Sequence, residues 1–553
     1  MTDGEVMAAA SEERFNRQKH YAALPYESIQ YCLDAAGIEP AAVDQIVIPS
    51  DVVTSGAKLL LDRDDYDAEN ISRGSRPVGK RAKKWIAEQY RGWKQESSMP
   101  RYARTVEFPP EIPLRTVSHH EAHAASAYYT CGADEALVVT SDGLGDDISL
   151  SVWHGRDGEL RELYKVGKEG SFGYFYGVVT QALGWWVGNG EGKTMGLSSY
   201  GDPPAELVDR LARYCPQFED GRLAEPTPVG YPSAWRHLDT FHPNFEEVGE
   251  VEALLADYDR EDVAAAAQQL LETEILGLVD HWLAETGTDA LALAGGVFLN
   301  VAVNRELLSG LALSDFHAFP AAGDDGLPVG AVLSAYHVDN PEARPQRMVH
   351  PDLGPGLPEE EIPSILEGRK LEFSRPDSLT DRVADLLLEG KIVAWCQGRM
   401  EYGPRALGNR SILIDPRLAD GKDRVNREIK FRESWRPFAP SILAPAAEEY
   451  LVDPYPDPFM ITSYDVREEK REEIPAVTHT DGTTRPQVVT REAVPRYYDL
   501  IETFDEKGGV PVVLNTSFNL SGDPIVCTPE DAVGTFYNCG LDALALGDYL
   551  LEK

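Results

Sequence analysis

The chain has 553 residues, too many for a single hydrophobic core, so we expect at least two domains. Its formal net charge is −40, which disfavours non-specific binding to nucleic acid and is typical of an acidic soluble enzyme or of a protein adapted to high internal salt. The sequence has no apolar run long enough for a membrane span, no signal-peptide pattern at its start and no C-x-x-C pair among its six cysteines, so we expect a cytoplasmic protein without a cysteine zinc site.

Strand-like and helix-like segments alternate through the middle of the chain, which predicts an α/β fold with ligand loops at the carboxyl ends of strands. The expected strands are residues 136–143, 148–155, 160–167 and 290–300. The expected helices are residues 261–287, closed by Gly287, and 301–310.

A segment rich in proline, glycine and acidic residues, 349–366, is the expected linker between a first domain (1–348) and a second (367–553). The second domain is expected to alternate strands and helices, beginning with strand 391–398 and ending with 511–522 and 542–551. Residues 55–112 are polar, with a basic patch at 79–85, and indicate an insertion or a helical lobe.

The stretch HHEAHAASA (119–127) places two histidines four residues apart. His119 and His123 would share one face of a helix and could reach one ion, although such a pair alone is more often structural. A metal needs further ligands, and Asp324 and Asp325 lie in a glycine-flanked turn after a short strand. Histidine and carboxylate ligands suit Fe(II), zinc or manganese.

Three glycine-containing turns are candidate nucleotide sites. Asp142 and Gly143 follow a strand, where the aspartate could hold a metal or a polar ligand, or simply form a hairpin turn. Gly295 and Gly296 suit a phosphate at a strand-to-helix turn, or close packing of the two elements. The segment around Lys193, GNGEGKTMGLSSYG, lacks the spacing of a P-loop, which we therefore reject.

Two basic clusters stand out in so acidic a protein. Residues 401–417 and 429–441 predict a site for phosphate or carboxylate oxygens, with surface ion pairing to Glu428 and Glu433 as the alternative. Their cations are Arg405, Arg410, Lys430, Arg432 and Arg436. The later stretch LNTSFNLSGDP (514–524) could bind sugar or phosphate oxygens, or form a capped turn.

These stretches together resemble one family, the NodU-type nodulation carbamoyltransferases and the O-carbamoyltransferases of antibiotic biosynthesis. The resemblance runs in the family order from about residue 5 to the end of the chain. The matching stretches are AAASEERFNRQKH, SHHEAHAASAYY, GEGKTMGLSSYG, LALAGGVFLNVAVN, PAAGDDGLPVGA, EYGPRALGNRSIL, KFRESWRPFAPS and LNTSFNLSGDPIVCTPEDA.

The resemblance implies an N-terminal, duplicated α/β domain of the actin-like ATPase (ASKHA) type and a smaller YrdC-like α/β domain. It implies that His119, His123 and Asp324 hold Fe(II) or another divalent metal. It also implies that carbamoyl phosphate and ATP form carbamoyl-adenylate, whose carbamoyl group passes to a hydroxyl of a small-molecule or sugar acceptor.

The resemblance further implies roles for individual residues. The catalytic residues would be His119, His120, Lys430 and Arg436. The residues expected to bind ATP and carbamoyl phosphate are Asp142, Gly143, Lys193, Gly295, Gly296, Asn300, Gly323, Asp325, Arg405, Arg410, Arg432, Arg485, Asn515 and Ser517.

Family members carry a further strand and a His-Asp pair upstream of the position of Met1, so we expect the true start to lie earlier. Two other functions stay open: threonylcarbamoyl transfer to tRNA, which the acidic surface disfavours, and a non-catalytic nucleotide-binding scaffold. The acceptor loops are expected in 55–112 and 203–250, and a homodimer is left open.

Overall fold

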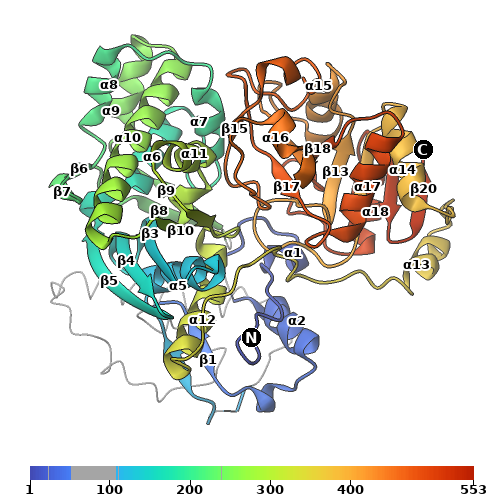
Figure 1. Cartoon of the computed structure of the whole chain (residues 1–553), viewed down its shortest axis with the longest axis horizontal. Coiled ribbons are helices and arrows are strands. Elements are labelled where there is room, and N and C mark those ends of the chain that lie inside the picture. The colour runs from blue at the N-terminus through green and yellow to red at the C-terminus, as the bar shows by residue number, and fades with distance from the viewer. Residues whose placement is uncertain (23, 51–107, 110, 238–239) are drawn as a thin grey trace.

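The computed structural model describes residues 1–22, 24–50, 108–109, 111–237 and 240–553, so most of the expected insertion at 55–112 lies outside the described residues. Two mixed α/β lobes stand side by side (Figure 1), one around a five-stranded sheet and one around a seven-stranded sheet. The α/β prediction is confirmed. The division of the chain at 349–366 into two domains stays a prediction.

The five-stranded sheet has the order β11-β10-β3-β4-β5. An antiparallel meander of β3, β4 and β5 forms one side, and β10 and β11 run parallel to β3. The predicted strands are confirmed: β3 (Glu135–Gly145), β4 (Ile148–Arg156), β5 (Glu159–Gly167) and β10 (Ala290–Ala294), joined by β11 (Asp315–Ala318). All five residues of β10 are buried, as expected for a strand covered on both faces.

The helices of this lobe pack against its sheet and against one another. The two predicted helices are confirmed as α10 (Arg260–Thr286), ended by Gly287 in the left-handed conformation, and α11 (Val301–Gly310). The others are α5 (His119–Cys131), α6 (Phe172–Ala182), α7 (Glu191–Ser198), α8 (Ala205–Ala212), α9 (Val248–Glu252) and α12 (Leu327–Asp339). Two small hairpins, β6 (Gln217–Glu219) with β7 (Arg222–Glu225) and β8 (Ser233–His237) with β9 (Thr240–Asn244), complete it.

The N-terminal segment holds short elements: α1 (Glu13–Asn16), α2 (Tyr26–Ala36) and β1 (Ile46–Ile48), which pairs in parallel with β2 (Leu114–Thr116). In Figure 1, α1 and α2 lie below the seven-stranded lobe. The duplicated actin-like architecture stays a prediction.

The seven-stranded sheet has the order β17-β14-β18-β13-β12-β19-β20. Its strands are β12 (Val393–Cys396), β13 (Arg410–Ile414), β14 (Ala439–Leu443), β17 (Gln487–Val489), β18 (Val512–Ser517), β19 (Ala543–Leu546) and β20 (Tyr549–Glu552). Its longer helices are α14 (Leu379–Leu388), α17 (Pro495–Glu506) and α18 (Pro529–Tyr537). The shorter elements are α15 (Gly421–Val425), a π-helix (Asn426–Lys430), α16 (Ala447–Tyr450), β15 (Tyr464–Asp465) and β16 (Thr483–Thr484).

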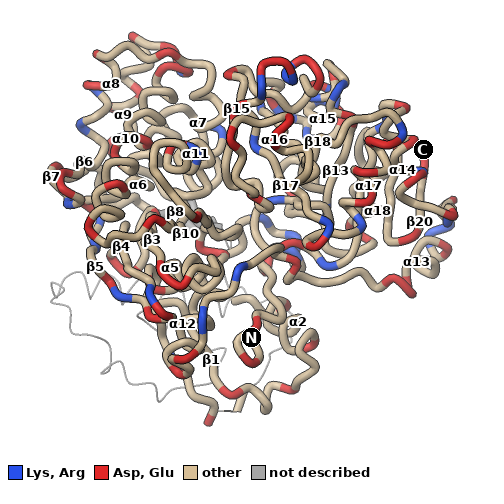
Figure 2. The backbone as a smooth tube through the Cα atoms, in the orientation of Figure 1, with Lys and Arg blue, Asp and Glu red and all other residues tan. Residues whose placement is uncertain are grey.

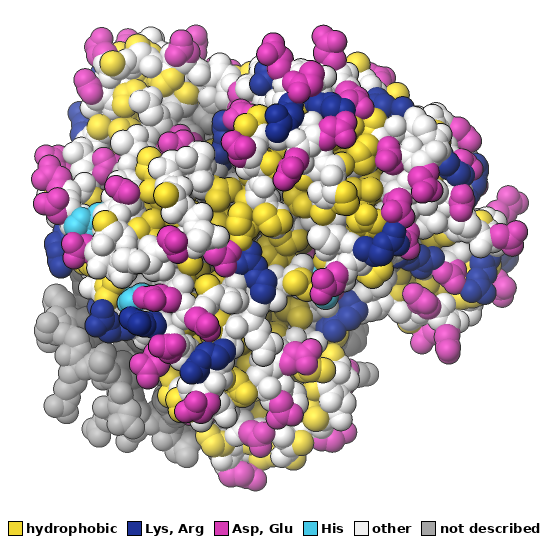
Figure 3. Space-filling view, viewed as in Figure 1, with side chains coloured by type: hydrophobic (Ala, Val, Ile, Leu, Met, Phe, Trp, Pro, Cys, Tyr) yellow, Lys and Arg dark blue, Asp and Glu magenta, His cyan; other side chains and the backbone are white. Residues whose placement is uncertain are grey.

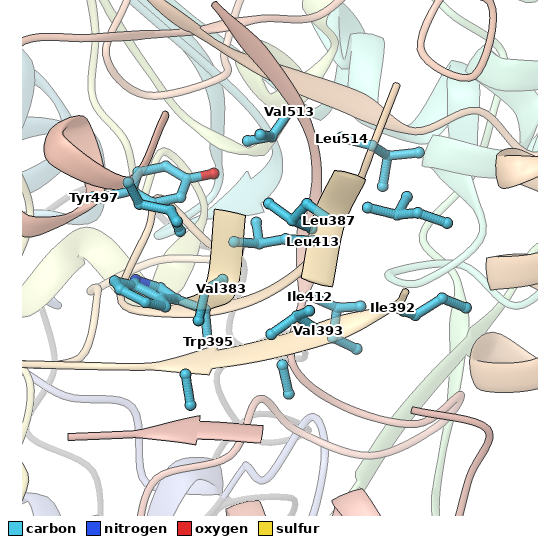
Figure 4. Packing of buried hydrophobic residues seen from close by; sticks show 14 of the residues in the cluster. Val383, Leu387, Ile392, Val393, Trp395, Ile412, Leu413, Tyr497, Val513 and Leu514 are labelled. Atoms are coloured by element: carbon cyan, nitrogen blue, oxygen red, sulfur yellow. The ribbon is translucent and has the colours of Figure 1, made fainter. Parts of the chain in front are cut away.

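A dense apolar core fixes this second lobe. Figure 4 shows Trp395 of β12 and Leu413 of β13 packed with Leu387 of α14, and all three are fully buried. A YrdC-like fold for this lobe stays a prediction.

The segment expected to be a linker contains structure at its end. Helix α13 (Ile362–Gly368) begins inside 349–366. Its residues Ile362 and Leu366 are fully buried in the core of the second lobe, so this end of the segment packs as part of that lobe. The preceding residues are also held, since the Leu353 carbonyl accepts from the amide of Ala9 at 3.0 Å.

The surface agrees with the composition. Acidic residues lie over both lobes (Figure 2), and hydrophobic side chains gather where the lobes meet on the face seen in Figure 3. Within the described ranges, no helix combines the length and the apolar character needed to cross a bilayer.

Candidate active site

Four metal-ligating side chains meet at one edge of the five-stranded sheet. Because β3, β10 and β11 are parallel, their carboxyl ends share this edge, which brings Asp142 near Asp324. The N-terminal turns of α5 add His119 and His123, and one ligand atom from each residue lies within 4.8 Å of all the others.

The distances between these atoms suit a small cation. The Nε2 atom of His119 lies 3.6 Å from Asp142 Oδ2 and 3.5 Å from Asp324 Oδ1. The Nε2 atom of His123 lies 3.2 Å and 3.7 Å from the same two oxygens. Ligand atoms about 2.1 Å from a tetrahedral ion lie about 3.4 Å apart. The group can therefore hold a divalent metal.

The electrostatics point the same way. Burial lowers the pKa of His123, but the carboxylates of Asp142 and Asp324 outweigh burial and raise it to about 9. Burial raises the pKa of Asp142, and His119 and His123 bring it well below its usual range. The buried Nε2 atom of His119 has no hydrogen-bond partner in the described part of the chain. Two carboxylates facing two imidazoles thus form a site in which positive charge is stabilised.

The structure brings together the three residues that the resemblance implied and adds Asp142. The sequence left this aspartate open as a metal ligand, a polar ligand or part of a hairpin turn. Its Oδ1 atom accepts from the Gly143 amide at 2.6 Å, which leaves Oδ2 directed at the histidines.

His120 was expected to be catalytic, and its contacts favour a structural role instead. Its Nε2 atom lies 3.0 Å from the carbonyl of Ile148, and its Nδ1 atom lies 2.6 Å from the hydroxyl of Thr140. Burial and the neighbouring histidines lower the pKa of His120 to about 3. A neutral His120 that uses both ring nitrogens inside the protein holds α5 against β3 and β4.

Gly145 makes room for His119. A Cβ atom at position 145 would lie 2.1 Å from Cγ of His119, far closer than van der Waals contact allows. We therefore expect Gly145→Ala to displace the imidazole and weaken metal binding by roughly 10–100-fold, measured by metal titration of the purified protein. Gly277→Ala on α10, where nothing lies within 4 Å of the added atom, is the control. Unchanged metal affinity of Gly145→Ala would contradict this role.

The glycine turn after β10 supports the packing alternative. Gly295 has φ +99°, and a Cβ atom there would lie 2.2 Å from the carbonyl oxygen of Ser141. A Cβ atom at position 296 would lie 3.1 Å from Oδ1 of Asp142, so Gly296 packs closely against this carboxylate. Asn300 caps α11, where it accepts from the amides of Ala302 and Val303, and its expected role in binding cofactor stays a prediction.

The turn that carries Asp324 touches the second lobe. Gly323 precedes the short helix Asp324–Gly326, and the hydroxyl of Tyr402 donates to the carbonyl of Asp325. Burial raises the pKa of Asp325 to about 6, opposed by the guanidinium of Arg14. We call the edge of the sheet that carries His119, His123, Asp142 and Asp324 the metal edge. It is therefore in direct contact with the loop after β12.

A group of cations, Lys430 buried and four arginines half-buried, forms a second candidate site in the seven-stranded lobe. Burial and the charges of Arg405 and Arg432 lower the pKa of Arg485. Burial and the charge of Arg436 likewise lower the pKa of Arg432. The Nε atom of Arg405 is buried without a hydrogen bond among the residues described. The nearby carboxylate of Asp457 is taken up by backbone amides of residues 459–462. Positive charges thus gather closely enough here to lower one another's pKa.

Lys430 closes one end of this cluster. Its ammonium group donates to the carbonyl of Ser517 at 2.6 Å and to Asn519 Oδ1 at 2.8 Å, and the Ser517 hydroxyl is 3.3 Å away. Burial and nearby Arg432 lower the pKa of Lys430 well below its usual range. The two stretches KFR and TSFNLSG thus meet at one amine.

Two residues expected to bind cofactor have contacts inside the protein, and their role toward the cofactor stays a prediction. Arg410 is fully buried and gives its guanidinium to carbonyls, including that of Gln397 at 2.6 Å and of Pro355 at 3.2 Å. Asn515 donates to the carbonyl of Ala406 and to the hydroxyl of Ser441.

Comparison with known proteins assigns the chain. A family model described as the carbamoyltransferase N-terminus matches residues 1–333, and one described as the carbamoyltransferase C-terminus matches 384–553. The chain belongs to the carbamoyltransferase family. It is thus a carbamoyltransferase, and the family named from the motifs is confirmed.

Relatives of this carbamoyltransferase span nearly its whole length. Nodulation protein NolNO of Sinorhizobium fredii is 36% identical over 568 residues, covering 100% of this chain and 78% of that protein. An uncharacterised protein of Synechocystis sp. is 35% identical over 588 residues, covering 100% of this chain and 94% of that protein. Among solved structures, a component of (R)-2-hydroxyglutaryl-CoA dehydratase from Acidaminococcus fermentans is 15% identical, and the match covers 57% of this chain and 84% of that one. Its TM-score of 0.30 is too low to carry an argument.

The motif analysis missed one cation of this carbamoyltransferase, Lys19. It follows α1 and lowers the pKa of Lys430, and burial lowers its own pKa. The segment is fixed by Arg17, which donates to the carbonyls of Pro524 and Ile525 at 2.9 and 2.6 Å. Lys19 lies in the quoted stretch AAASEERFNRQKH, but only the fold brings that stretch to the second lobe.

Lys193 also joins the lobes of the carbamoyltransferase. It was expected to bind cofactor, and its ammonium group lies 3.4 Å from Glu433 Oε1, close to Arg436. The ion-pair alternative considered for Glu433 is therefore present, with a partner from the other lobe.

A buried carboxylate pair supports the loop that carries Arg405. Glu401 Oε1 accepts from the amides of Leu407, Asn409 and Arg410, at 2.7, 2.8 and 3.2 Å. Burial and the charge of Glu401 raise the pKa of Asp352 to about 7.

The pKa of Asp352 makes stability depend on pH. The unfolded chain ionises this group near pH 4, so stability falls as the pH rises from about 4 to about 7, by on the order of 4 kcal/mol. We expect Asp352→Asn to raise Tm more at pH 8 than at pH 5, measured by calorimetry. Asp377→Asn, at an exposed position, is the control. An equal change in Tm at both pH values would contradict the effect.

Proposed function

We propose that this carbamoyltransferase forms carbamoyl-adenylate from ATP and carbamoyl phosphate in the cation cluster of the seven-stranded lobe. The carbamoyl group then passes to an acceptor hydroxyl at the metal edge of the five-stranded sheet. The observation that carries the proposal is the gathering of five cations, because a polyanion stabilises a group of this kind. They are Lys430, which is buried, and the half-buried Arg432, Arg436, Arg405 and Arg485.

In the adenylation step, each bond that forms is matched by a bond that breaks. Water releases phosphate from carbamoyl phosphate and leaves carbamate, whose oxygen attacks the α-phosphorus of ATP. The bond between the α- and β-phosphates breaks, and pyrophosphate departs. Lys430 and the arginines hold the phosphate oxygens and neutralise the charge that develops on them. Lys19 adds a further positive charge from the N-terminal segment.

The transfer step takes place at the metal edge. The acceptor oxygen attacks the carbamoyl carbon, and the bond between that carbon and the phosphate oxygen breaks. AMP departs, and the hydroxyl proton passes to its phosphate. His119, His123, Asp142 and Asp324 would hold Fe(II) or another divalent ion, which when bound would polarise the carbamoyl carbonyl as a Lewis acid. Gly295 and Gly296 let the turn after β10 pack closely against Ser141 and Asp142, which helps to position this carboxylate.

Contacts between the lobes support a link between the two steps. Tyr402 bonds to the turn of Asp324 and Asp325, and a Cβ atom at Gly403 would lie 3.0 Å from the carbonyl of Pro320. Arg405, two residues further on, belongs to the cation cluster. Carbamoyl-adenylate is a mixed anhydride that water destroys, so a short enclosed route between neighbouring loops protects it.

The test is the dependence of pyrophosphate release on carbamoyl phosphate. Purified protein with ATP and metal is expected to release pyrophosphate only when carbamoyl phosphate is added. A requirement for threonine and bicarbonate instead would assign the chain to threonylcarbamoyl transfer. No ATP turnover with either donor would contradict an adenylating enzyme.

A further inference from the structure

The loop between the π-helix and β14 is folded around one buried side chain, Asn426. This residue begins the π-helix, is 1% exposed and has no part in the reaction proposed above. The loop, residues 431–437, directly follows Lys430 and carries Arg432 and Arg436 of the cation cluster. The contacts of Asn426 therefore decide where these three cations lie.

The chain reverses its direction at Phe431 and returns to Asn426. Phe431 has φ +46°, a left-handed conformation that a bulky side chain rarely adopts. The amides of Phe431 and Arg432 both donate to the carbonyl of Asn426, the second of them at 3.2 Å. Because Phe431 is 62% exposed, packing of its ring does not account for the strain. Strained turns of this kind are concentrated at functional sites.

The side chain of Asn426 closes the loop from the inside. Its Nδ2 atom donates to the carbonyls of Ser434 and Arg436, at 3.4 and 3.1 Å. Its Oδ1 atom accepts from Nε of Arg432 at 2.7 Å. One amide group thus joins the guanidinium of the first arginine in the loop to the backbone of the second.

Two contacts restrict the guanidinium of Arg432. Asn426 holds its inner edge at Nε, and its central carbon lies 4.7 Å from the ring centre of Phe438, which is buried. An arginine over an aromatic ring at this distance is attracted by the negative face of the ring. The plane of the guanidinium is therefore fixed on one edge and on one face.

The outer edge of the same guanidinium is left for a ligand. Its Nη2 atom reaches only the carbonyl of Pro437, at 3.5 Å, and in the part of the chain that the structure describes no group accepts from Nη1. Asn426 is uncharged, so it orients Arg432 without neutralising it. A planar fork with its inner edge fixed and its outer edge open matches two oxygens of a phosphate group.

We propose that Asn426 is a positioning residue for ATP, which turns the guanidinium of Arg432 so that Nη1 and Nη2 receive phosphate oxygens of the nucleotide. The inference deepens the proposed function and rests on it. Asn426 does not contact ATP and acts through Arg432.

A double-mutant cycle on the full-length protein tests this role, with the affinity for ATP and Mg²⁺ measured by calorimetry in the absence of carbamoyl phosphate. Arg432→Ala and Asn426→Ala are each expected to weaken ATP binding by about tenfold or more. In the Arg432→Ala background, Asn426→Ala is expected to have no further effect, because no guanidinium is left to orient. Asn538→Ala is the matched control, since Asn538 is exposed at the end of α18 and donates to the carbonyl of Gly534.

Two outcomes would overturn the inference: unchanged ATP affinity of the Asn426 variant, or an equal loss with and without Arg432, which is the result of a merely structural role. Asn426→Ser, whose side chain is too short to reach Arg432, is measured in the same cycle in case Tm shows that Asn426→Ala does not fold. Carbamoyl-phosphate-dependent pyrophosphate release by the unaltered protein is measured in parallel. Release without the coupling of Asn426 to Arg432 would overturn this inference and leave adenylation intact. The coupling without release would overturn the adenylation proposal alone.

Discussion

Replacing Lys430 with alanine is expected to lower carbamoyl-phosphate-dependent pyrophosphate release by roughly 10²–10³-fold, the usual effect of removing one charged group that stabilises a transition state. The amine is buried at 4% exposure among the oxygens of Ser517 and Asn519, beside Arg432. Metal content is expected to stay at the level of the unaltered protein, because the metal edge lies in the other lobe.

The control for Lys430 is Arg427→Ala in the same π-helix. Arg427 is 69% exposed and pairs with Glu428, so its loss removes a cation from this helix without opening the cluster. Its pyrophosphate release is expected to match that of the unaltered protein. If Lys430→Ala kept full pyrophosphate release, or lost it only together with its folded structure as judged by Tm, the role of the amine would be refuted.

Replacing His123 with alanine is expected to reduce metal affinity by roughly 100-fold or more. The imidazole is fully buried and faces both Asp142 and Asp324, so its removal takes away one of the two imidazoles that oppose these carboxylates. Carbamoyl transfer to acceptor is expected to fail, whereas adenylation in the second lobe continues. Metal content by plasma mass spectrometry and pyrophosphate release, measured on the same sample, separate the two effects.

His154→Ala is the matched control for His123. His154 lies on β4 of the same sheet and pairs with Glu135 at 2.8 Å, away from the metal edge. Its metal content is expected to equal that of the unaltered protein. Retention of metal by His123→Ala would show that the four-residue group is not the metal site.

The regular parts of the first lobe were predictable from the sequence. Strand β10 is buried on both faces, so its sequence is a continuous apolar run. Helix α10 is buried on one face, so its apolar residues recur with the helical period until Gly287 ends the helix. The spacing of His119 and His123 likewise required only that the segment be helical.

The surroundings of individual site residues depend on tertiary contacts, which the sequence does not show. Arg410 was placed with the anion-binding arginines because its neighbours are basic. The structure buries it and directs its two terminal nitrogens to backbone carbonyls, and its role toward a cofactor stays a prediction. His120 looks like its neighbours His119 and His123 in the sequence and differs only in the face of α5 that it occupies. Lys19 was overlooked because the contacts of Arg17 with Pro524 and Ile525 bridge some 500 residues of chain.

The most direct test of adenylation is the fate of label from ¹³C-carbamoyl phosphate, with ATP and no acceptor, followed by ¹³C and ³¹P NMR. The cation cluster of the second lobe predicts a ¹³C-carbamoyl group bonded to AMP, with one pyrophosphate released for each adenylate formed. Formation of ADP in place of AMP, or label that never joins the nucleotide, would contradict it.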